Sequence, residues 1–362
     1  MCFSEDDEQI STVATYSHKH EVSNLSFSNT NPSLFATVYN TVDSTHASIW
    51  KFPENRSFLS TSGNTNAPEP PVSELDLVGE IPFESEENVS CLQWLPSGGQ
   101  TIICATSSGI REVFVREGGG AAASKPYVID TSSSQLKFGD DRASFIGSIA
   151  CDPHHASEVS VAFDSSIISF DLRSRERIRN IERADSPGSK TVSGCVRSLS
   201  YNPNKPWVLA SGGDDHRVHF WDVRKANAPV KTLSGHSHWV TAVSFNPFHD
   251  QLILSGGTDA QVNLWRISSI SSAPLLELAE DLTENEDDSS SNVTTPSLIS
   301  ETRRSEPKLA ADIAIRVQTD HSDSITALTW SERTAWVYAS MSSDGKVVVS
   351  QVPSAEKYKV LL

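Results

Sequence analysis

A histidine, a serine and an aspartate, the residue types of a hydrolase triad, occur together with a tryptophan in one stretch of the chain: His236, Ser255, Asp259 and Trp265. In a triad the histidine takes the serine proton and the aspartate orients the imidazole. The alternative is a buried structural set, in which the aspartate accepts backbone N–H groups and holds the histidine, while the serine hydroxyl bonds the histidine and the indole N–H.

Partial copies of this set favour the structural alternative. Ser211, Asp215 and Trp221 repeat it without a histidine at the matching position, and His321, Ser340 and Asp344 repeat it with Ser350 where the tryptophan belongs. A nucleophile would be needed once, so we expect no catalytic residue and no cofactor. Removal of one member of a buried set should cost about 1.5–3 kcal/mol.

The elements that must position these residues form a repeat. Residues 196–225 and 240–269 read as two copies of one unit, in which Val196 and Val240, like Trp221 and Trp265, are 44 positions apart. A period of about 40–45 residues that ends in Trp-Asp is typical of a WD-repeat blade. We expect an all-β, WD-repeat β-propeller with four strands per blade, and we assign the glycines of SGGDD and SGGTD to tight turns.

Six units are legible, starting near residues 18, 89, 146, 196, 240 and 321. We expect one domain over residues 1–362. Residues 268–312 interrupt the rhythm with seven acids between Glu277 and Asp288, followed by a Ser/Asn/Thr/Pro stretch. We expect an acidic, serine-rich, disordered loop there, inserted between the last two blades, because such a composition buries too little apolar surface to fold. A spacer, an acidic docking strip and a phosphorylation target are the open interpretations.

The composition limits the partners. A net charge of −17 argues against binding the nucleic-acid backbone. Five scattered cysteines without a CxxC pair indicate a reducing compartment and buried thiols. The N-terminal residues carry no secretory signal pattern, and no apolar run has the length of a membrane span. We expect a cytoplasmic, monomeric protein that meets membranes only through partners.

Three further motifs have both a structural and a functional interpretation. His154 and His155 are adjacent and have no third ligand at a useful spacing, so we expect a turn and no metal site. The arginines of DLRSRERIRN (Arg173, Arg175, Arg177 and Arg179) either protect an edge strand or contact an acidic partner. Trp207 and Trp336 occupy equivalent places in two repeats, which favours packing between blades.

His238 and Trp239 precede the first strand of the fifth unit, in a loop that reaches one rim of the ring. An exposed tryptophan there would anchor a partner, and the alternative is packing between blades. We take His238 and Trp239 as the candidate partner contact.

The whole chain resembles one family, the EARP and GARP complex-interacting proteins. The stretches that carry the resemblance are YNPNKPWVLASGGDDHRVHFWDVR (201–224), PVKTLSGHSHWV (229–240), HDQLILSGGTDAQV (249–262) and WVYASMSSDGKVVVSQVPSAEKYKVLL (336–362). The HSHW core together with the AEKYKVLL ending is the most specific part. QLKF at 135–138 and DPHH at 152–155 also fit in order.

The resemblance implies a non-enzymatic adaptor of endosomal traffic. Members of the family bind two related multisubunit tethers, one in recycling from endosomes and one in retrograde transport to the trans-Golgi network. It further implies a peripheral location at endosomes and the trans-Golgi network. Family members look seven-bladed, with one blade of sequence before the unit that comes first here. We therefore expect either a ring that lacks its N-terminal blade or a ring that closes differently, and an open ring would expose unpaired strand edges.

The alternative function is that of a substrate receptor of a cullin-type ubiquitin ligase. Trp221-Asp222-Val223-Arg224 matches the Trp-Asp-x-Arg pattern that such WD proteins carry, and Arg224 would be the contact. Phe170-Asp171-Leu172-Arg173 is a variant of this pattern one blade earlier.

Overall fold

The structure is a computed structural model. It describes residues 2–4, 9–11, 15–28, 30–53, 72–83, 87–96, 100–107, 109–117, 127–131, 136–137, 145–182, 194–225, 227–273, 276–277, 308–309 and 311–361. None of the helices within these ranges is long and apolar enough to cross a membrane.

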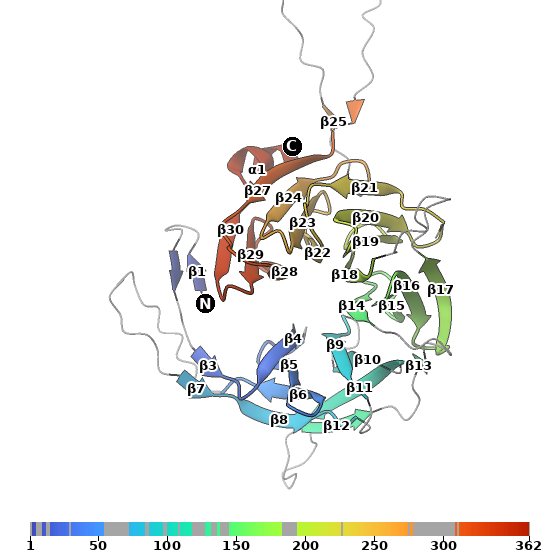
Figure 1. The fold of residues 1–362 in the computed structure, drawn as a ribbon, viewed down its shortest axis with the longest axis vertical. Helices are drawn as coiled ribbons and strands as arrows, with labels where there is room; N and C mark the ends of the chain where they lie inside the picture. The colour runs from blue at the N-terminus through green and yellow to red at the C-terminus, as the bar shows by residue number, and fades with distance from the viewer. Residues whose placement is uncertain are drawn as a thin grey trace, which may run out of the picture.

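Six antiparallel sheets stand around a central axis as the blades of a β-propeller (Figure 1). Each blade runs from its innermost to its outermost strand. The first three consist of β4 (Glu21–Phe27), β5 (Leu34–Asn40), β6 (Thr45–Lys51) and β8 (Asp76–Glu80); of β9 (Val89–Trp94), β10 (Thr101–Thr106), β11 (Gly109–Glu117) and β12 (Tyr127–Thr131); and of β14 (Ile146–Cys151), β15 (Glu158–Phe163), β16 (Ser166–Asp171) and β17 (Glu176–Glu182).

The remaining blades follow the same order. They consist of β18 (Val196–Tyr201), β19 (Val208–Gly213), β20 (Arg217–Asp222) and β21 (Lys231–Ser234); of β22 (Val240–Phe245), β23 (Leu252–Gly257), β24 (Val262–Arg266) and β27 (Ile313–Gln318); and of β28 (Ile325–Trp330), β29 (Val337–Ser342) and β30 (Val347–Gln351). The smaller elements are β1 (Cys2–Ser4), β2 (Gln9–Ser11), β3 (Thr15–Ser17), β7 (Val72–Glu74), β13 (Leu136–Lys137), β25 (Leu276–Glu277), β26 (Lys308–Leu309) and α1 (Ser354–Leu361).

The placement of the acidic insert differs from the sequence prediction. β24 pairs with β27, so residues 268–312 lie between the third and fourth strands of the fifth blade and not between the last two blades. The reason is that β27, the fourth strand of this sheet, follows the insert in the sequence, so the insert interrupts the fifth blade. Most of the insert is outside the described residues, so its expected disorder stays a prediction.

The hydrophobic core lies between neighbouring blades. Each innermost strand packs on the next, from β4 through β9, β14, β18 and β22 to β28. Close approach explains two glycines that we had assigned to turn geometry alone. A Cβ on Gly212 would lie 2.6 Å from Val240 Cγ1, and one on Gly256 would lie 2.6 Å from Ile325 Cγ2. Their absent side chains let one blade seat against the next.

The ring has a gap between its first and last blades (Figure 1). Apolar side chains on these blades are exposed: Leu25 by 47% and Phe27 by 48% on β4, and Met341 by 46% on β29. The last blade also has three strands, whereas four of the other blades have four and the second has five with β13, so β30 has no further strand beside it in its sheet. The expected unpaired strand edge is therefore present in the described residues, and the first and last blades also expose apolar side chains.

The described thiols are mostly buried. Cys91, Cys104 and Cys151 are buried and free, whereas Cys195 is half-buried. Burial raises the pKa of both Cys91 and Cys151 to about 12. These two thiols therefore stay protonated and pack as small apolar groups.

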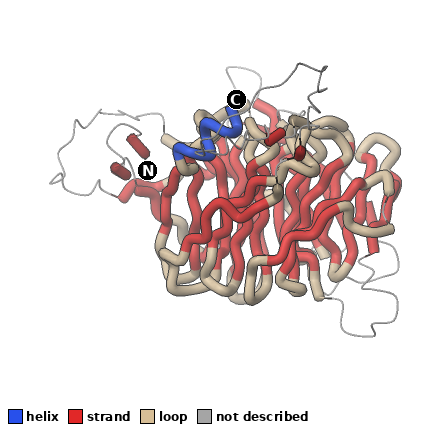
Figure 2. Tube along the Cα trace, turned by 90° about the horizontal axis from the view of Figure 1, so that it is seen from above, coloured by secondary structure: helices blue, strands red, loops and turns tan. Residues whose placement is uncertain are grey.

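Antiparallel pairing gives the ring two rims, seen edge-on in Figure 2. The b–c rim carries the turns between second and third strands and the loops that lead into first strands, including 235–239 and 258–261. The a–b rim carries the turns between first and second strands and those that follow third strands, including 202–207, 172–175 and 223–230. Helix α1 follows β30 on the a–b rim (Figure 2).

Candidate functional site: the b–c rim of the fourth and fifth blades

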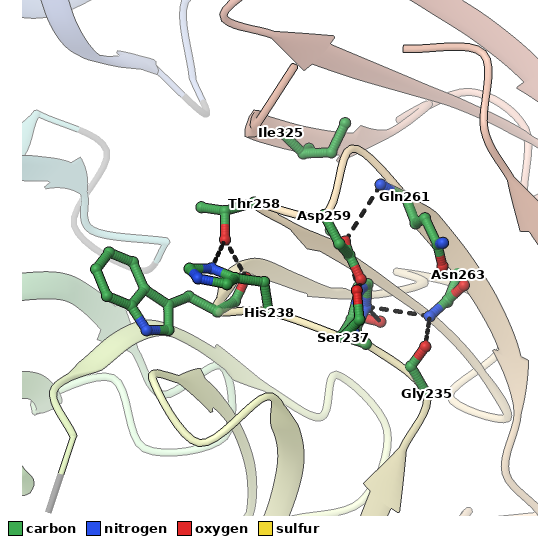
Figure 3. A network of polar contacts seen from close by, with 12 residues as sticks. Gly235, Ser237, His238, Thr258, Asp259, Gln261, Asn263 and Ile325 are labelled. Carbon is green, nitrogen blue, oxygen red and sulfur yellow. Dashed lines mark hydrogen bonds and ion pairs between the residues drawn. The ribbon is translucent and has the colours of Figure 1, made fainter. Parts of the chain in front are cut away.

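The fifth blade brings its four predicted residues together. His236 Nδ1 lies 3.1 Å from both Asp259 carboxylate oxygens, and His236 Nε2 lies 2.7 Å from Ser255 Oγ. The Trp265 indole N–H donates to Ser255 Oγ at 2.8 Å. The Asp259 carboxylate also accepts the backbone N–H of Ser237 and of Gln261, the latter drawn in Figure 3.

The electrostatics of this set keep the histidine neutral. Burial lowers the pKa of His236 below its usual value, and the neighbouring Asp259 only partly offsets that. A neutral imidazole that donates Nδ1–H to Asp259 can accept the Ser255 hydroxyl at Nε2. Ser255 is fully buried, so its oxygen meets neither solvent nor a substrate. The arrangement can fix the turn at 258–261 to the sheet of the fifth blade. Its serine hydroxyl is not accessible as a nucleophile.

The fourth blade also has a histidine in contact with its turn aspartate, and the sequence analysis did not identify this histidine. The Trp221 indole donates to Ser211 Oγ at 2.8 Å. His219, which lies on β20 itself, places Nε2 2.5 Å from Asp215 Oδ2 and Nδ1 3.0 Å from Thr232 Oγ1. The repeat pattern predicts a histidine only in the loop before the first strand, whereas His219 lies on the third strand. Its position two residues before the tryptophan, where the fifth blade has Asn263, was the available signal.

The sixth blade forms a looser version. His321 Nε2 lies 2.8 Å from Ser340 Oγ, but His321 Nδ1 is 3.7 Å from Asp344 Oδ1. The Asp344 carboxylate accepts the backbone N–H of Ser322 and of Lys346, and these bonds hold its pKa well below the usual value. At the missing tryptophan, Gln318 Nε2 donates to Ser350 Oγ at 2.6 Å.

The first blade holds a further partial set that the sequence analysis did not single out. The Trp50 indole donates to Thr37 Oγ1 at 2.9 Å, and His18 Nε2 lies 3.5 Å from the same oxygen. In the third blade, Asp164 Oδ1 accepts the backbone N–H of Phe145 at 2.8 Å and so fixes the loop into the first strand.

The candidate partner contact lies next to the buried set of the fifth blade. Trp239 is 37% exposed, and the Arg197 guanidinium carbon lies 4.3 Å from its ring centroid. His238 bonds Thr258 through Nδ1 (Figure 3) and stacks on His216 with ring centroids 5.5 Å apart. We call His216, His238, Trp239 and Arg197 the HW patch. Arg197 also bonds Asp214, so Trp239 both packs against the fourth blade and presents a face to solvent.

Arg224 lies on the other rim. Its guanidinium forms a two-point contact with Asp222, at 2.9 Å and 2.7 Å, and its side chain remains 57% exposed. The structure therefore does not bring Arg224 together with His238 and Trp239. The Asp222 hydrogen bond raises the pKa of Arg224 further, so the group stays charged.

The interpretation of His154 and His155 as a turn without a third ligand needs correction on one point. Asp152, His155 and Glu158 place possible ligand atoms within 4.8 Å of one another. All three already have partners: Asp152 Oδ2 lies 3.0 Å from His155 Nδ1, and Arg179 donates to Glu158. The His155 ring also packs on Trp207, with centroids 4.0 Å apart. Through the contact of His155 with Trp207, the cluster packs the third blade against the fourth.

Comparisons with known proteins extend this picture. A family model described as "EIPR1 beta-propeller" matches residues 1–265, and one described as "WD domain, G-beta repeat" matches residues 314–349. The chain is 33% identical over 351 residues to "EARP and GARP complex-interacting protein 1" of Rattus norvegicus. The matched residues cover 94% of this chain and 83% of the relative. The Homo sapiens protein of that name is 34% identical over 353 residues, with the same coverage.

A plant relative lies in the same range. "WD repeat-containing protein DWA2" of Arabidopsis thaliana is 31% identical over 342 residues, which cover 93% of this chain and 81% of the relative. The likeness in each case extends across nearly the whole ring and is not confined to single repeats.

Proposed function

The chain belongs to the EIPR1 β-propeller family, and we propose on that premise that it is a non-enzymatic adaptor that binds EARP- and GARP-type tethering complexes. The animal relatives are named for interaction with these complexes. The adaptor would act in endosomal recycling and in endosome-to-Golgi retrograde transport. It would be a cytoplasmic monomer, peripheral at endosomes and the trans-Golgi network, that reaches membranes only through its partners.

The observation that supports a binding role is the HW patch. Tryptophan and arginine are the residue types that most often dominate binding energy at interfaces. Arg197 holds the Trp239 ring in place, so little side-chain freedom would be lost on binding. We propose that the exposed face of Trp239 and the neighbouring His238 contact the tether.

Against catalysis, the serines of the described hydrogen-bond sets are buried: Ser211 is 2% exposed, Ser255 is fully buried and Ser340 is 3% exposed. We therefore propose that His236, Asp259 and Trp265, with their counterparts in other blades, maintain the ring and contact no partner.

Affinity purification of the tagged chain from its own cells, with mass spectrometry of the partners, tests the proposed function. Recovery of the subunits shared by the two tethers is the expected result. Trp239→Ala should reduce that recovery, whereas Phe248→Ala, which removes a 45% exposed aromatic ring on the a–b rim, should not. Recovery of no tether subunit by the intact, folded chain would refute the proposal.

The cullin-ligase alternative and the tether proposal predict different effects of substituting Arg224. Under that alternative, Arg224→Ala abolishes recovery of ligase components. Under the tether proposal, Arg224→Ala leaves recovery of tether subunits unchanged, because Arg224 lies on the rim opposite the HW patch.

A further inference from the structure

An unusual backbone conformation marks one tryptophan on the a–b rim. Trp207 has φ +68°, in the left-handed region that bulky side chains rarely adopt. The other non-glycine residues with positive φ in the described ranges are Asp164, His216 and Ala260, in turns between second and third strands, and Arg175, in the turn after a third strand. Trp336, which occupies the equivalent place in the sixth blade, has no positive φ.

The strained conformation places the indole between cations of two blades. Arg179 of the third blade lies with Cζ 5.2 Å from the Trp207 ring centroid, and Arg224 of the fourth blade lies at 5.8 Å. The His155 ring packs against the same indole. Trp207 therefore joins two groups of positive charge that are far apart in the sequence.

Each group of positive charge contains further basic residues besides the arginine that contacts the tryptophan. Arg173, Arg175 and Arg177 are exposed beside Arg179, and Lys225 is exposed beside Arg224. Within the described ranges, neither Arg177 nor Lys225 has a carboxylate oxygen within 4.0 Å. Arg173 has only a 3.7 Å contact with Asp171 and remains 81% exposed. Arg177 pairs with Phe170, which packs toward the second blade, so Arg177 lies on the opposite face of the sheet from Arg179. We call Trp207 with Arg173, Arg179, Arg224 and Lys225 the Trp207 surface.

We propose that the Trp207 surface binds an acidic polypeptide segment. Arginine and tryptophan are the residue types enriched at the centres of interfaces, and exposed guanidinium groups bind carboxylates in two-point contacts. The strain at Trp207 is of the kind that accumulates at binding sites.

The size of the charged area favours a short segment over an extended polyanion. The whole chain carries −17, whereas on this part of the rim the exposed Arg173 and Lys225 add positive charge beside the ion pairs Arg179–Glu158 and Arg224–Asp222. At physiological salt, exposed charges interact over about 8 Å, so a peptide seated on the Trp207 surface meets mainly local cations. A bilayer or a nucleic acid would extend over the acidic remainder of the molecule.

This inference goes beyond the adaptor proposal, because the Trp207 surface and the HW patch lie on opposite rims. An adaptor must hold a second partner while it holds the first. The two surfaces could be occupied at the same time, and the loss of one leaves the other intact.

Binding of a fluorescein-labelled glutamate-rich peptide to the full chain, measured by fluorescence anisotropy, tests the proposal. The test variant is Arg173→Glu/Lys225→Glu. The control is Lys19→Glu/Arg217→Glu, the same charge change at two exposed residues of the b–c rim. The test variant should lose about 10-fold or more in affinity, the control less than about 3-fold, and wild-type binding should weaken as salt rises.

Two checks make the outcome decisive. Thermal melting must show that both variants fold, which is expected because all four side chains are exposed. Equal losses in test and control would overturn the proposal, and so would the absence of peptide binding by the wild-type chain. Binding of phosphatidylserine vesicles that is as strong as peptide binding and equally sensitive to the test variant would assign the surface to a membrane instead. Recovery of tether subunits is measured in parallel, so failure here is separate from failure of the adaptor proposal.

Discussion

The fifth and sixth blades use the same four positions and reach different results. In the fifth, His236 contacts Asp259 at 3.1 Å and Trp265 completes the set. In the sixth, the histidine is 3.7 Å from its aspartate and a serine replaces the tryptophan. The fifth blade lies between two neighbours, whereas the sixth has one side toward the gap (Figure 1).

The comparison of the two blades shows that the shared aspartate fixes the turn between second and third strands in both. The burial of the strands depends instead on the neighbouring blades. Every residue of β23 is buried, but on β29, the matching strand of the sixth blade, Met341 is 46% exposed. A buried set needs every partner, because unsatisfied polar groups are costly away from water. The sixth-blade set is buried as well, with Ser340 3% and His321 7% exposed, and among the described residues the Nδ1 atom of His321 has no hydrogen-bond partner.

Among the polar sets, the largest expected effect follows from Asp259→Ala. Three groups lose their acceptor, namely the buried His236 ring and the backbone N–H groups of Ser237 and Gln261. We expect the free energy of unfolding to fall by about 2–3 kcal/mol. Thermal and urea melts measure it. Asp344→Ala in the sixth blade should have a smaller effect, and an equal or larger one would break the comparison.

His219→Ala tests whether the fourth blade has a true substitute for the missing loop histidine. The substitution leaves Asp215 and Thr232 without this partner, so we expect a loss of about 1–2 kcal/mol. Arg217→Ala, two residues before His219 on β20 and with an exposed side chain, serves as the control. If both variants melt like the wild type, His219 is not part of the scaffold.

The pH dependence separates the two blades further. Because burial lowers the pKa of His236, the unfolded chain binds the proton more readily than the folded one. The contribution of His236 is therefore complete above its ordinary value of 6.5 and is lost as the pH falls below it. The lowered pKa of Asp344 gives a contribution that is lost only below its ordinary value of 3.8. Melting temperatures from pH 7.5 to 5 should fall more for the wild type than for His236→Gln, and parallel curves would contradict the assignment.

The smallest effect is expected at the gap. Leu25 and Leu199 hold equivalent positions on innermost strands, opposite Thr37 and Ser211. Leu25 is 47% exposed and Leu199 is 6% exposed. We expect Leu199→Ala to cost about 2–4 kcal/mol and Leu25→Ala less than about 1 kcal/mol, since only the first creates a cavity. Similar losses in the two variants would mean that the face of β4 is covered in solution.

The sequence predicted the features that repeat. The 44-residue spacing and the Trp-Asp ends were sufficient for the propeller and for the four members of the fifth-blade set, because each depends on residues close in the sequence. His219 was missed because its imidazole enters from a strand instead of a loop. The close blade contact at Gly256 could not be foreseen, since it depends on Ile325 of the next blade.

The rims were less predictable than the interior. The arginines of DLRSRERIRN were expected to protect an edge strand or to contact an acidic partner, but Arg173 and Arg175 lie in a turn, and Arg179 points to Glu158 and Trp207. Likewise, Trp239 was assigned either to packing or to exposure, and the structure gives it both. Such outcomes depend on side chains of the adjacent blade, which a single repeat does not encode.

We propose that the buried sets maintain the ring while the HW patch binds the tether. The most direct test measures the affinity of the purified chain for the purified tether, together with its melting temperature, for Trp239→Ala and Asp259→Ala. We expect Trp239→Ala to lose about 10-fold or more in affinity while melting within about 2 °C of the wild type. We expect Asp259→Ala to melt early and to regain near-normal affinity when cooled well below its melting temperature. Unchanged tether affinity in Trp239→Ala, or early melting of that variant, would contradict the account.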